Sequence, residues 1–133
     1  MFDPSPANIE ARTQRFTLPN GLKGALLPKK TKGGLVSATI VLRTGTAESL
    51  KGKVDPGSFA AGLLMRGTER LSRQEIKDAF DQLKAQVTVG GGAEGVTASV
   101  KTTRENLAPA MALLAEVLRK PKFDATEFGE LQR

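Results

Sequence analysis

The order of strand-like and helix-like segments is the feature that most constrains the fold of this chain. Short segments rich in β-branched or alternating apolar residues come first, amphipathic segments follow, and the series then recurs in a shorter form. Hairpin strands and helices in separate blocks predict an α+β fold, with a mainly antiparallel sheet and helices packed on one face. The expected strands are 15–18, 22–27, 35–42, 86–89 and 96–101, and the expected helices are 55–67, 72–83, 107–118 and 124–133.

Local signals place the starts of the two central helices. Asp55 suits an N-cap position and Pro56 the first turn of a helix. Ser72 and Glu75 have the spacing of a capping box. Apolar residues then recur at i, i+3, i+4 and i+7, so we expect this second helix to bury one face against a core.

The length of 133 residues suffices for one ordinary domain with its own core. The proline-rich segment 1–13 is expected to be an extended lead-in, and 14–133 is expected to form a single α+β domain. Segment 124–133 has the pattern of a helix, but no Gly or Pro stop signal follows it. We therefore expect the chain to be a fragment of a longer two-domain protein.

The net charge of +6 and the pI near 9.9 raise the question of an anionic partner. The densest basic run, 29–32, precedes a Gly-Gly turn, and elsewhere Lys and Arg alternate with acidic residues. This distribution is typical of a solvated surface, so no nucleic-acid partner is expected; a basic module that binds anionic surfaces remains an alternative. No segment approaches the roughly 20 apolar residues of a membrane helix. The absence of Cys excludes disulfides and leaves the compartment open.

Segment 55–68 has the sequence Asp-Pro-Gly-Ser-Phe-Ala-Ala-Gly-Leu-Leu-Met-Arg-Gly-Thr. It resembles the metal-binding helix of the pitrilysin/insulinase family of zinc metallopeptidases, which carries His-x-x-Glu-His shortly before a Gly-Thr pair. When its last two residues are aligned with that pair, Ser58 and Gly62 fall on the histidines and Ala61 on the glutamate. None of these side chains can ligate Zn²⁺ as an imidazole does or activate a water, and the chain contains no histidine.

Further pieces of the same family pattern follow in order. Segment 16–22, Phe-Thr-Leu-Pro-Asn-Gly-Leu, resembles the opening hairpin of the family, and Leu71-Ser72 resembles the exit from the metal helix. Segments 104–118 and 121–128 resemble its long helix and the turn after it. The match covers nearly the whole chain after residue 13 and would correspond to the first half of one family domain.

The resemblance implies a catalytically inactive domain that helps enclose and bind a peptide substrate. It would pack against an active peptidase domain, in the same chain or in another subunit. Zn²⁺ is then expected in that partner and no cofactor in this chain, which is not an enzyme on its own. A homo-oligomer is compatible with this role, and the family favours a bacterial periplasm over a cytoplasm.

In active family domains the strand at this place pairs with substrate backbone by β-augmentation. Glycines in such an edge strand let another backbone approach closely. The candidate substrate-binding residues are Gln86, Val87, Thr88, Val89, Gly90 and Gly91.

Several alternatives stay open at this stage. Segment 58–62 could be a small-residue helix face that allows close packing and has no relation to a metal site. The chain could also be a structural or interaction subunit of the same fold, with no peptidase role. The glycine-rich run 90–95 could cradle a phosphate, but it lacks the Gly-Lys-Ser/Thr ending, so a hairpin is favoured. Carboxylates alone could hold a hard cation, but no EF-hand-like spacing occurs. The arginines that could steer acidic peptides, or simply be solvated, are Arg66, Arg70, Arg73 and Arg104.

Overall fold

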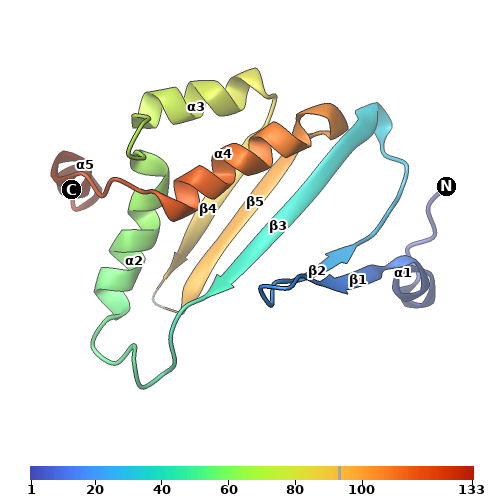
Figure 1. Cartoon of the computed structure of the whole chain (residues 1–133), viewed down its shortest axis with the longest axis horizontal. Helices are drawn as coiled ribbons and strands as arrows, with labels where there is room; N and C mark the ends of the chain where they lie inside the picture. The colour runs from blue at the N-terminus through green and yellow to red at the C-terminus, as the bar shows by residue number, and fades with distance from the viewer. Residues whose placement is uncertain (93) are drawn as a thin grey trace. The chain divides into compact units, whose positions relative to one another are not determined.

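The computed structural model describes residues 1–92 and 94–133. It divides the chain into two compact units, Met1–Gly34 and Leu35–Arg133 (Figure 1). The single domain over 14–133, and its place in a longer two-domain protein, stay predictions.

The first unit begins with a helix where an extended lead-in was expected. α1 spans Pro6–Arg12 and starts at Ser5, whose hydroxyl accepts a hydrogen bond from the backbone N of Asn8 at 3.4 Å. The prediction of an extended segment over 1–13 is therefore wrong for the helical part. Its physical reason is that a Ser N-cap followed directly by Pro is a helix start, which outweighs the extended preference of a proline-rich run.

A two-stranded hairpin completes this unit. β1 (Gln14–Thr17) pairs antiparallel with β2 (Lys23–Leu26), close to the two expected strands. Phe16 stands opposite Gly24, and a side chain at Gly24 would overlap the ring of Phe16, so the glycine lets the ring lie across the neighbouring strand. A short 3-10 turn, η1 (Lys32–Gly34), follows the basic run.

The second unit is built on a three-stranded antiparallel sheet in the order β3-β5-β4. β3 spans Leu35–Arg43, β4 spans Gln86–Gly92 and β5 spans Gly95–Thr103. Because β5 lies between the other two, β3 and β4 are the edges of this sheet. In one rung Thr39, Ser99 and Thr88 stand opposite one another, and in the next rung Ala38, Val100 and Val87 do so.

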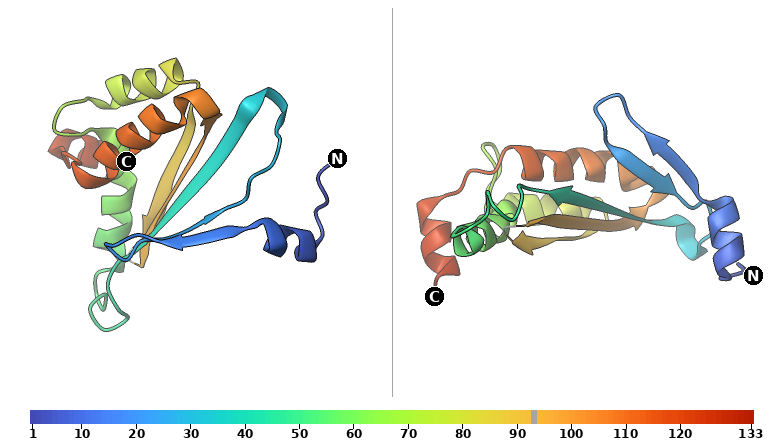
Figure 2. Two further views of the ribbon diagram at one scale, coloured as in Figure 1. Left: turned by 45° about the vertical axis from the view of Figure 1, so that its right-hand side comes forward. Right: turned by 90° about the horizontal axis from the view of Figure 1, so that it is seen from below.

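The two faces of this sheet differ in chemistry because alternate residues point to opposite sides. The apolar rungs face the helices, and Figure 2 shows α4 (Leu107–Arg119) lying across that side of the sheet. The other face carries hydroxyl, amide and amine side chains, most of them exposed. Its polar residues are Ser37, Thr39, Gln86, Thr88, Thr97, Ser99 and Lys101.

Five further helical segments belong to the second unit (Figure 1). They are α2 (Val54–Leu63), η2 (Leu64–Arg66), α3 (Arg73–Gln82), η3 (Arg104–Asn106) and α5 (Ala125–Leu131). α2 lies beside β4 at the edge of the sheet. The core joins α3, α4 and β5 and includes Ile76, Phe80, Val100, Ala110, Leu114 and Val117, which are nearly or fully buried.

The helix starts agree with expectation in one case and differ in the other. Ser72 and Glu75 form the complete capping box at the start of α3. α2 instead begins two residues early, with Lys53 at the N-cap and no side-chain cap, so Asp55 lies inside the first turn. An acidic residue still suits that position because it faces the positive end of the helix dipole. The predicted α+β fold with an antiparallel sheet is confirmed.

Candidate functional site

The three degenerate motif positions lie on α2 in three different environments. Ser58 is exposed, and its hydroxyl donates a hydrogen bond to the carbonyl oxygen of Val54 at 3.0 Å. Ala61 is 4% exposed and belongs to the packed interior. Gly62 is exposed, and a Cβ placed on it would lie 2.9 Å from Leu131 Cδ2 on α5. A hydroxyl, a methyl and a hydrogen atom therefore stand where the resemblance would place two imidazoles and a carboxylate.

These residues do not fit a zinc ion. Zinc sites need three or four nitrogen, sulfur or carboxylate ligands converging on one point. The sequence has no His and no Cys. Among residues 1–92 and 94–133, no group of three Asp or Glu side chains is arranged to hold a metal either. No step that needs zinc can be assigned to this face of α2.

A groove of about 810 Å³ lies between α3 and the first half of β4. Apolar side chains of Ile76, Phe80 and Val87 contribute to its lining, and Gln86 and Thr88 add polar groups. Its other lining residues are Met65, Ser72, Arg73, Gln74, Lys77, Asp81, Ala85 and Glu127. A mixed lining of this kind, at the edge of a sheet, suits an extended polypeptide better than a small charged ligand.

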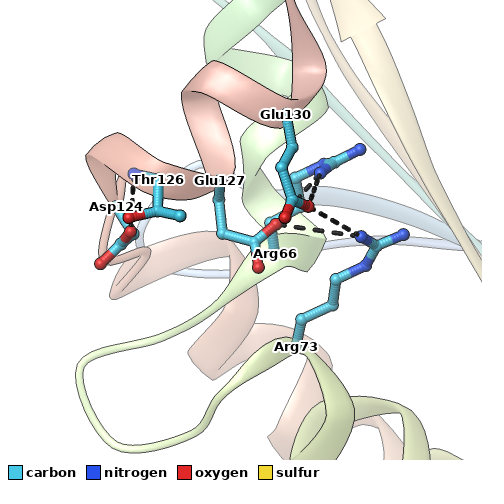
Figure 3. Close-up of polar contacts among 6 residues, drawn as sticks. All are labelled: Arg66, Arg73, Asp124, Thr126, Glu127 and Glu130. Carbon is cyan, nitrogen blue, oxygen red and sulfur yellow. Dashed lines mark hydrogen bonds and ion pairs between the residues drawn. The ribbon is translucent and has the colours of Figure 1, made fainter. Parts of the chain in front are cut away.

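Alternating charges from η2, α3 and α5 meet at one wall of the groove, where Arg73 and Glu127 line it and Arg66 of η2 pairs with Glu127 (Figure 3). Arg66 donates a hydrogen bond to Glu127 at 3.0 Å, and these side chains are only 18% and 25% exposed. Arg73 is held more loosely, with its Nη1 3.9 Å from Glu127 and 4.0 Å from Glu130. The Arg66–Glu127 pair fixes the wall, while Arg73 is mostly solvated.

The predicted substrate-binding strand is only partly at the groove. Gln86, Val87 and Thr88 line it. Val89, Gly90 and Gly91 lie further along β4 and do not line it. Their role in binding stays a prediction.

The glycines of this strand serve the sheet itself. A side chain at Gly91 would overlap the carbonyl oxygen of Gly95 on β5, whereas the space beside Gly90 is open. At Gly91, the backbone that comes close is thus the chain's own next strand. The phosphate-loop interpretation of 90–95 includes Ala93, which lies outside the described residues; Gly90 to Gly92 belong to a strand that pairs with another strand rather than leading into a helix.

The Gly67-Thr68 pair that follows α2 and η2 has a structural role. Thr68 is 2% exposed, and its Oγ1 donates to Glu116 Oε1 on α4 at 3.0 Å. Thr68 Oγ1 also accepts hydrogen bonds from the backbone N of Arg70 at 3.2 Å and of Leu71 at 3.0 Å. The Arg70 guanidinium also pairs with Glu116, which holds the pKa of that carboxyl below its usual value, and the Thr68 hydroxyl acts in the same direction. Arg70 is thus committed to this network.

Two apolar hollows of about 410 and 430 Å³ lie along α2. Both are lined by Pro56, Ala60 and Phe123. Phe123 is 50% exposed and has a φ of 51°, in the left-handed region that bulky residues avoid. Sequence reasoning missed this surface, although Pro121-Lys122-Phe123 after a long helix is the signal that could have indicated it.

No helix in the described part of the chain combines the length and the apolar character that a bilayer span requires. No protein-family model matches the sequence, and no curated protein matches it significantly.

Several solved structures share the fold. The peptidase M16 inactive domain from Pseudomonas fluorescens matches over 90% of this chain with a TM-score of 0.73 and 21% identity. A protease from Helicobacter pylori matches over 89%, with a TM-score of 0.71 and 21% identity. A mutant of the ferredoxin protease FusC, in complex with Arabidopsis ferredoxin, matches over 90%, with a TM-score of 0.71 and 18% identity.

The chain spans less than a third of each of these proteins: 29%, 28% and 13% of their respective lengths. At these identities the likeness concerns the fold. The groove, the charged wall and the small-residue face of α2 therefore stand on the same α+β fold as a domain described as an inactive peptidase domain.

Proposed function

We propose that this chain is a non-catalytic domain of the pitrilysin/insulinase family that helps enclose and bind a peptide substrate for an active zinc peptidase domain. The observation that carries the proposal is the groove along the first half of β4, next to a helix whose motif positions hold Ser58, Ala61 and Gly62. The ordered family pattern in the sequence and the shared fold with an inactive peptidase domain support it.

The lack of catalysis follows from the side chains at α2. Hydrolysis by this family needs a zinc-bound water and a carboxylate base, and serine, alanine and glycine supply neither. A serine nucleophile would need a base, and the chain has no imidazole for that purpose. The Ser58 hydroxyl is already donating to a backbone carbonyl in its own helix. Zn²⁺ and the bond-breaking residues are accordingly assigned to the partner domain.

Peptide binding would use the outer edge of β4. An edge strand offers backbone N–H and C=O groups that an added strand can pair with. Val87 gives an apolar contact for a substrate side chain, and Gln86 and Thr88 give polar contacts on alternate positions. The groove lining is nearly balanced in charge, with Arg73 and Lys77 set against Asp81 and Glu127, so we expect broad rather than acidic preference.

Packing against the active domain would use the hollows on either side of Phe123. Apolar surface grouped in this way commonly marks a protein–protein contact. The same observation favours a second candidate function, a structural or interaction subunit of this fold with no peptidase to serve. The two functions differ in whether the β4 groove binds peptide.

The test is a pair of Thr→Trp variants in one rung of the sheet. Thr88 and Thr39 are both exposed and stand in the same rung on opposite edges, but only Thr88 lines the groove. Binding of a fluorescein-labelled, unstructured 20-residue peptide is followed by anisotropy.

Thr88→Trp should fill the groove and weaken binding by about tenfold or more, equivalent to about 1.4 kcal/mol. Thr39→Trp should leave binding within about twofold, and mass spectrometry should show the peptide intact throughout. Equal effects of both variants, or peptide cleavage by the wild-type chain, would contradict the proposal. Absence of any peptide binding would favour the second candidate.

A further inference from the structure

β3 is an edge of the three-stranded sheet that lacks the usual protection against pairing with another strand. In the described part of the chain it pairs with β5 on one side only (Figure 1). Its nine residues keep an unbroken register with β5, so no bulge bends the strand. It contains no Pro, Gly or Lys, and its one charged residue, Arg43, is the last. Natural edge strands usually avoid this combination, because outward-facing backbone N–H and C=O groups can pair with a second strand.

Apolar side chains are exposed on both faces of β3. Leu35 and Val41, on the polar face of the sheet, are 40% and 63% exposed. Leu42, on the helix-covered face, is 38% exposed. Strands that are covered on both faces carry apolar residues in this way. The side chains of β3 therefore suit a strand in the middle of a sheet better than one at its edge.

We propose that β3 pairs antiparallel with β3 of a second copy of this chain, which joins two three-stranded sheets into one sheet of six strands. Thr39 is the fifth of the nine residues, so full overlap of two antiparallel copies places Thr39 opposite Thr39 of the second copy. The two-fold axis then passes between these residues, and the interface is isologous. Each side chain stays on its own face, so the helix-covered face and the polar face both continue across the axis.

The pattern of side chains on β3 is complementary to itself in this register. On the helix-covered face, Ala38 stands opposite the larger Ile40 of the second copy, and Leu42 stands opposite Val36. From Leu35 to Leu42 the strand carries no charge, so the pairing buries none. The two Arg43 side chains lie at opposite ends of the joint ladder, whereas a parallel in-register pair would place them side by side, where like charges destabilise. The charge pattern therefore selects a second copy in the antiparallel direction.

The two edges of the sheet would serve separate contacts. β5 separates β3 from β4, so β4 of each copy stays at an outer edge of the joined sheet. The groove between α3 and β4 then remains open in the dimer. The inference does not rest on peptide binding, and its test uses no peptide.

The test is sedimentation velocity of the whole 133-residue chain and its variants, from about 5 to about 500 μM. One strand pair is a small interface, so we expect a dissociation constant on the order of 10–100 μM for the dimer. Thr39→Lys places two ammonium groups opposite each other on the axis and should raise this constant about fivefold or more, and Thr39→Glu should do the same. Thr88→Lys is the matched control, because Thr88 is exposed in the same rung on the opposite edge; it should stay within about twofold.

Mixing the Thr39→Lys and Thr39→Glu chains tests the register. Opposite charges then face each other on the axis, so the mixture should associate within about threefold of wild type. If Thr39→Lys does not fold by circular dichroism, Val41→Lys replaces it and is mixed with Ser37→Glu, the position opposite in the proposed ladder. A wild-type chain that stays monomeric over the whole range would overturn the inference. Weakening by Thr88→Lys equal to that by Thr39→Lys, or a mixture no stronger than its separate members, would do so as well.

Discussion

The buried hydroxyl of Thr68 offers a quantitative prediction, because three hydrogen bonds join it to α4 and to the loop between η2 and α3. Thr68→Val keeps the shape of the side chain and removes its oxygen. The backbone N–H groups of Arg70 and Leu71 then lose their acceptor. An N–H left without a partner costs about 1–3 kcal/mol, and the low end applies here because the segment lies near the surface. Two such groups give a loss of about 2 kcal/mol.

The assay is urea unfolding followed by circular dichroism, with the thermal midpoint as a second measure. For a unit of this size, a loss of about 2 kcal/mol corresponds to a fall in Tm of about 8–16 °C. The urea midpoint should fall by about 1–2 M if the m-value is near 1–2 kcal/mol/M.

Thr103→Val is the matched control. Within the described residues, the Thr103 Oγ1 atom is buried and has no hydrogen-bond partner. Removing it should be neutral or slightly stabilising, because a buried hydroxyl without a partner contributes nothing that its removal could forfeit. A loss below about 0.5 kcal/mol for Thr68→Val, or the same loss for both variants, would refute the argument that Thr68 is kept for its hydrogen bonds.

Two further predictions concern the sheet and the acid dependence of stability. Gly91→Ala should destabilise the fold by about 1–3 kcal/mol, because its methyl group would overlap the Gly95 carbonyl. The control Gly90→Ala should change the stability by no more than about 0.5 kcal/mol. Thermal unfolding of the two variants measures the difference, and equal losses would contradict the prediction. The pKa of Glu116 is lowered by Arg70, so its contribution to stability is complete above the ordinary carboxyl pKa and is lost as pH falls through the lowered one. The stability difference between wild type and Arg70→Gln should therefore shrink from pH 7 to pH 3 in urea titrations, and a difference that is constant with pH would exclude this pair as a source of acid sensitivity.

Much of the fold could be predicted from sequence because its signals are local. The capping box at Ser72 and the apolar spacing after it identify α3 without tertiary information. The helix α1 is harder to predict because a proline-rich composition favours an extended segment, whereas the Ser-Pro pair at Ser5 favours a helix start. The division of the chain after Gly34 depends on long-range contacts that no local pattern encodes.

The candidate site was less predictable. The strand edge at Gln86 to Thr88 could be proposed from its place in the family pattern. The other wall of the groove is formed by α3, and its position depends on how that helix packs against the sheet. The approach of Leu131 to Gly62 joins residues 69 positions apart and carries no sequence signal beyond the missing side chain. The glycine run predicts space for the backbone of a bound peptide, yet at Gly91 that space is occupied by β5.

Phe123 combines a backbone conformation that favours glycine with a large apolar side chain that is half in water. Neither property stabilises the isolated chain, because the first strains the backbone and the second exposes apolar surface to water. A residue with two such costs is retained most easily when it contacts another molecule. The surface around Phe123 therefore serves binding rather than folding. Substitutions that relax the backbone at position 123 would then raise the stability of the isolated domain and weaken its binding to a partner.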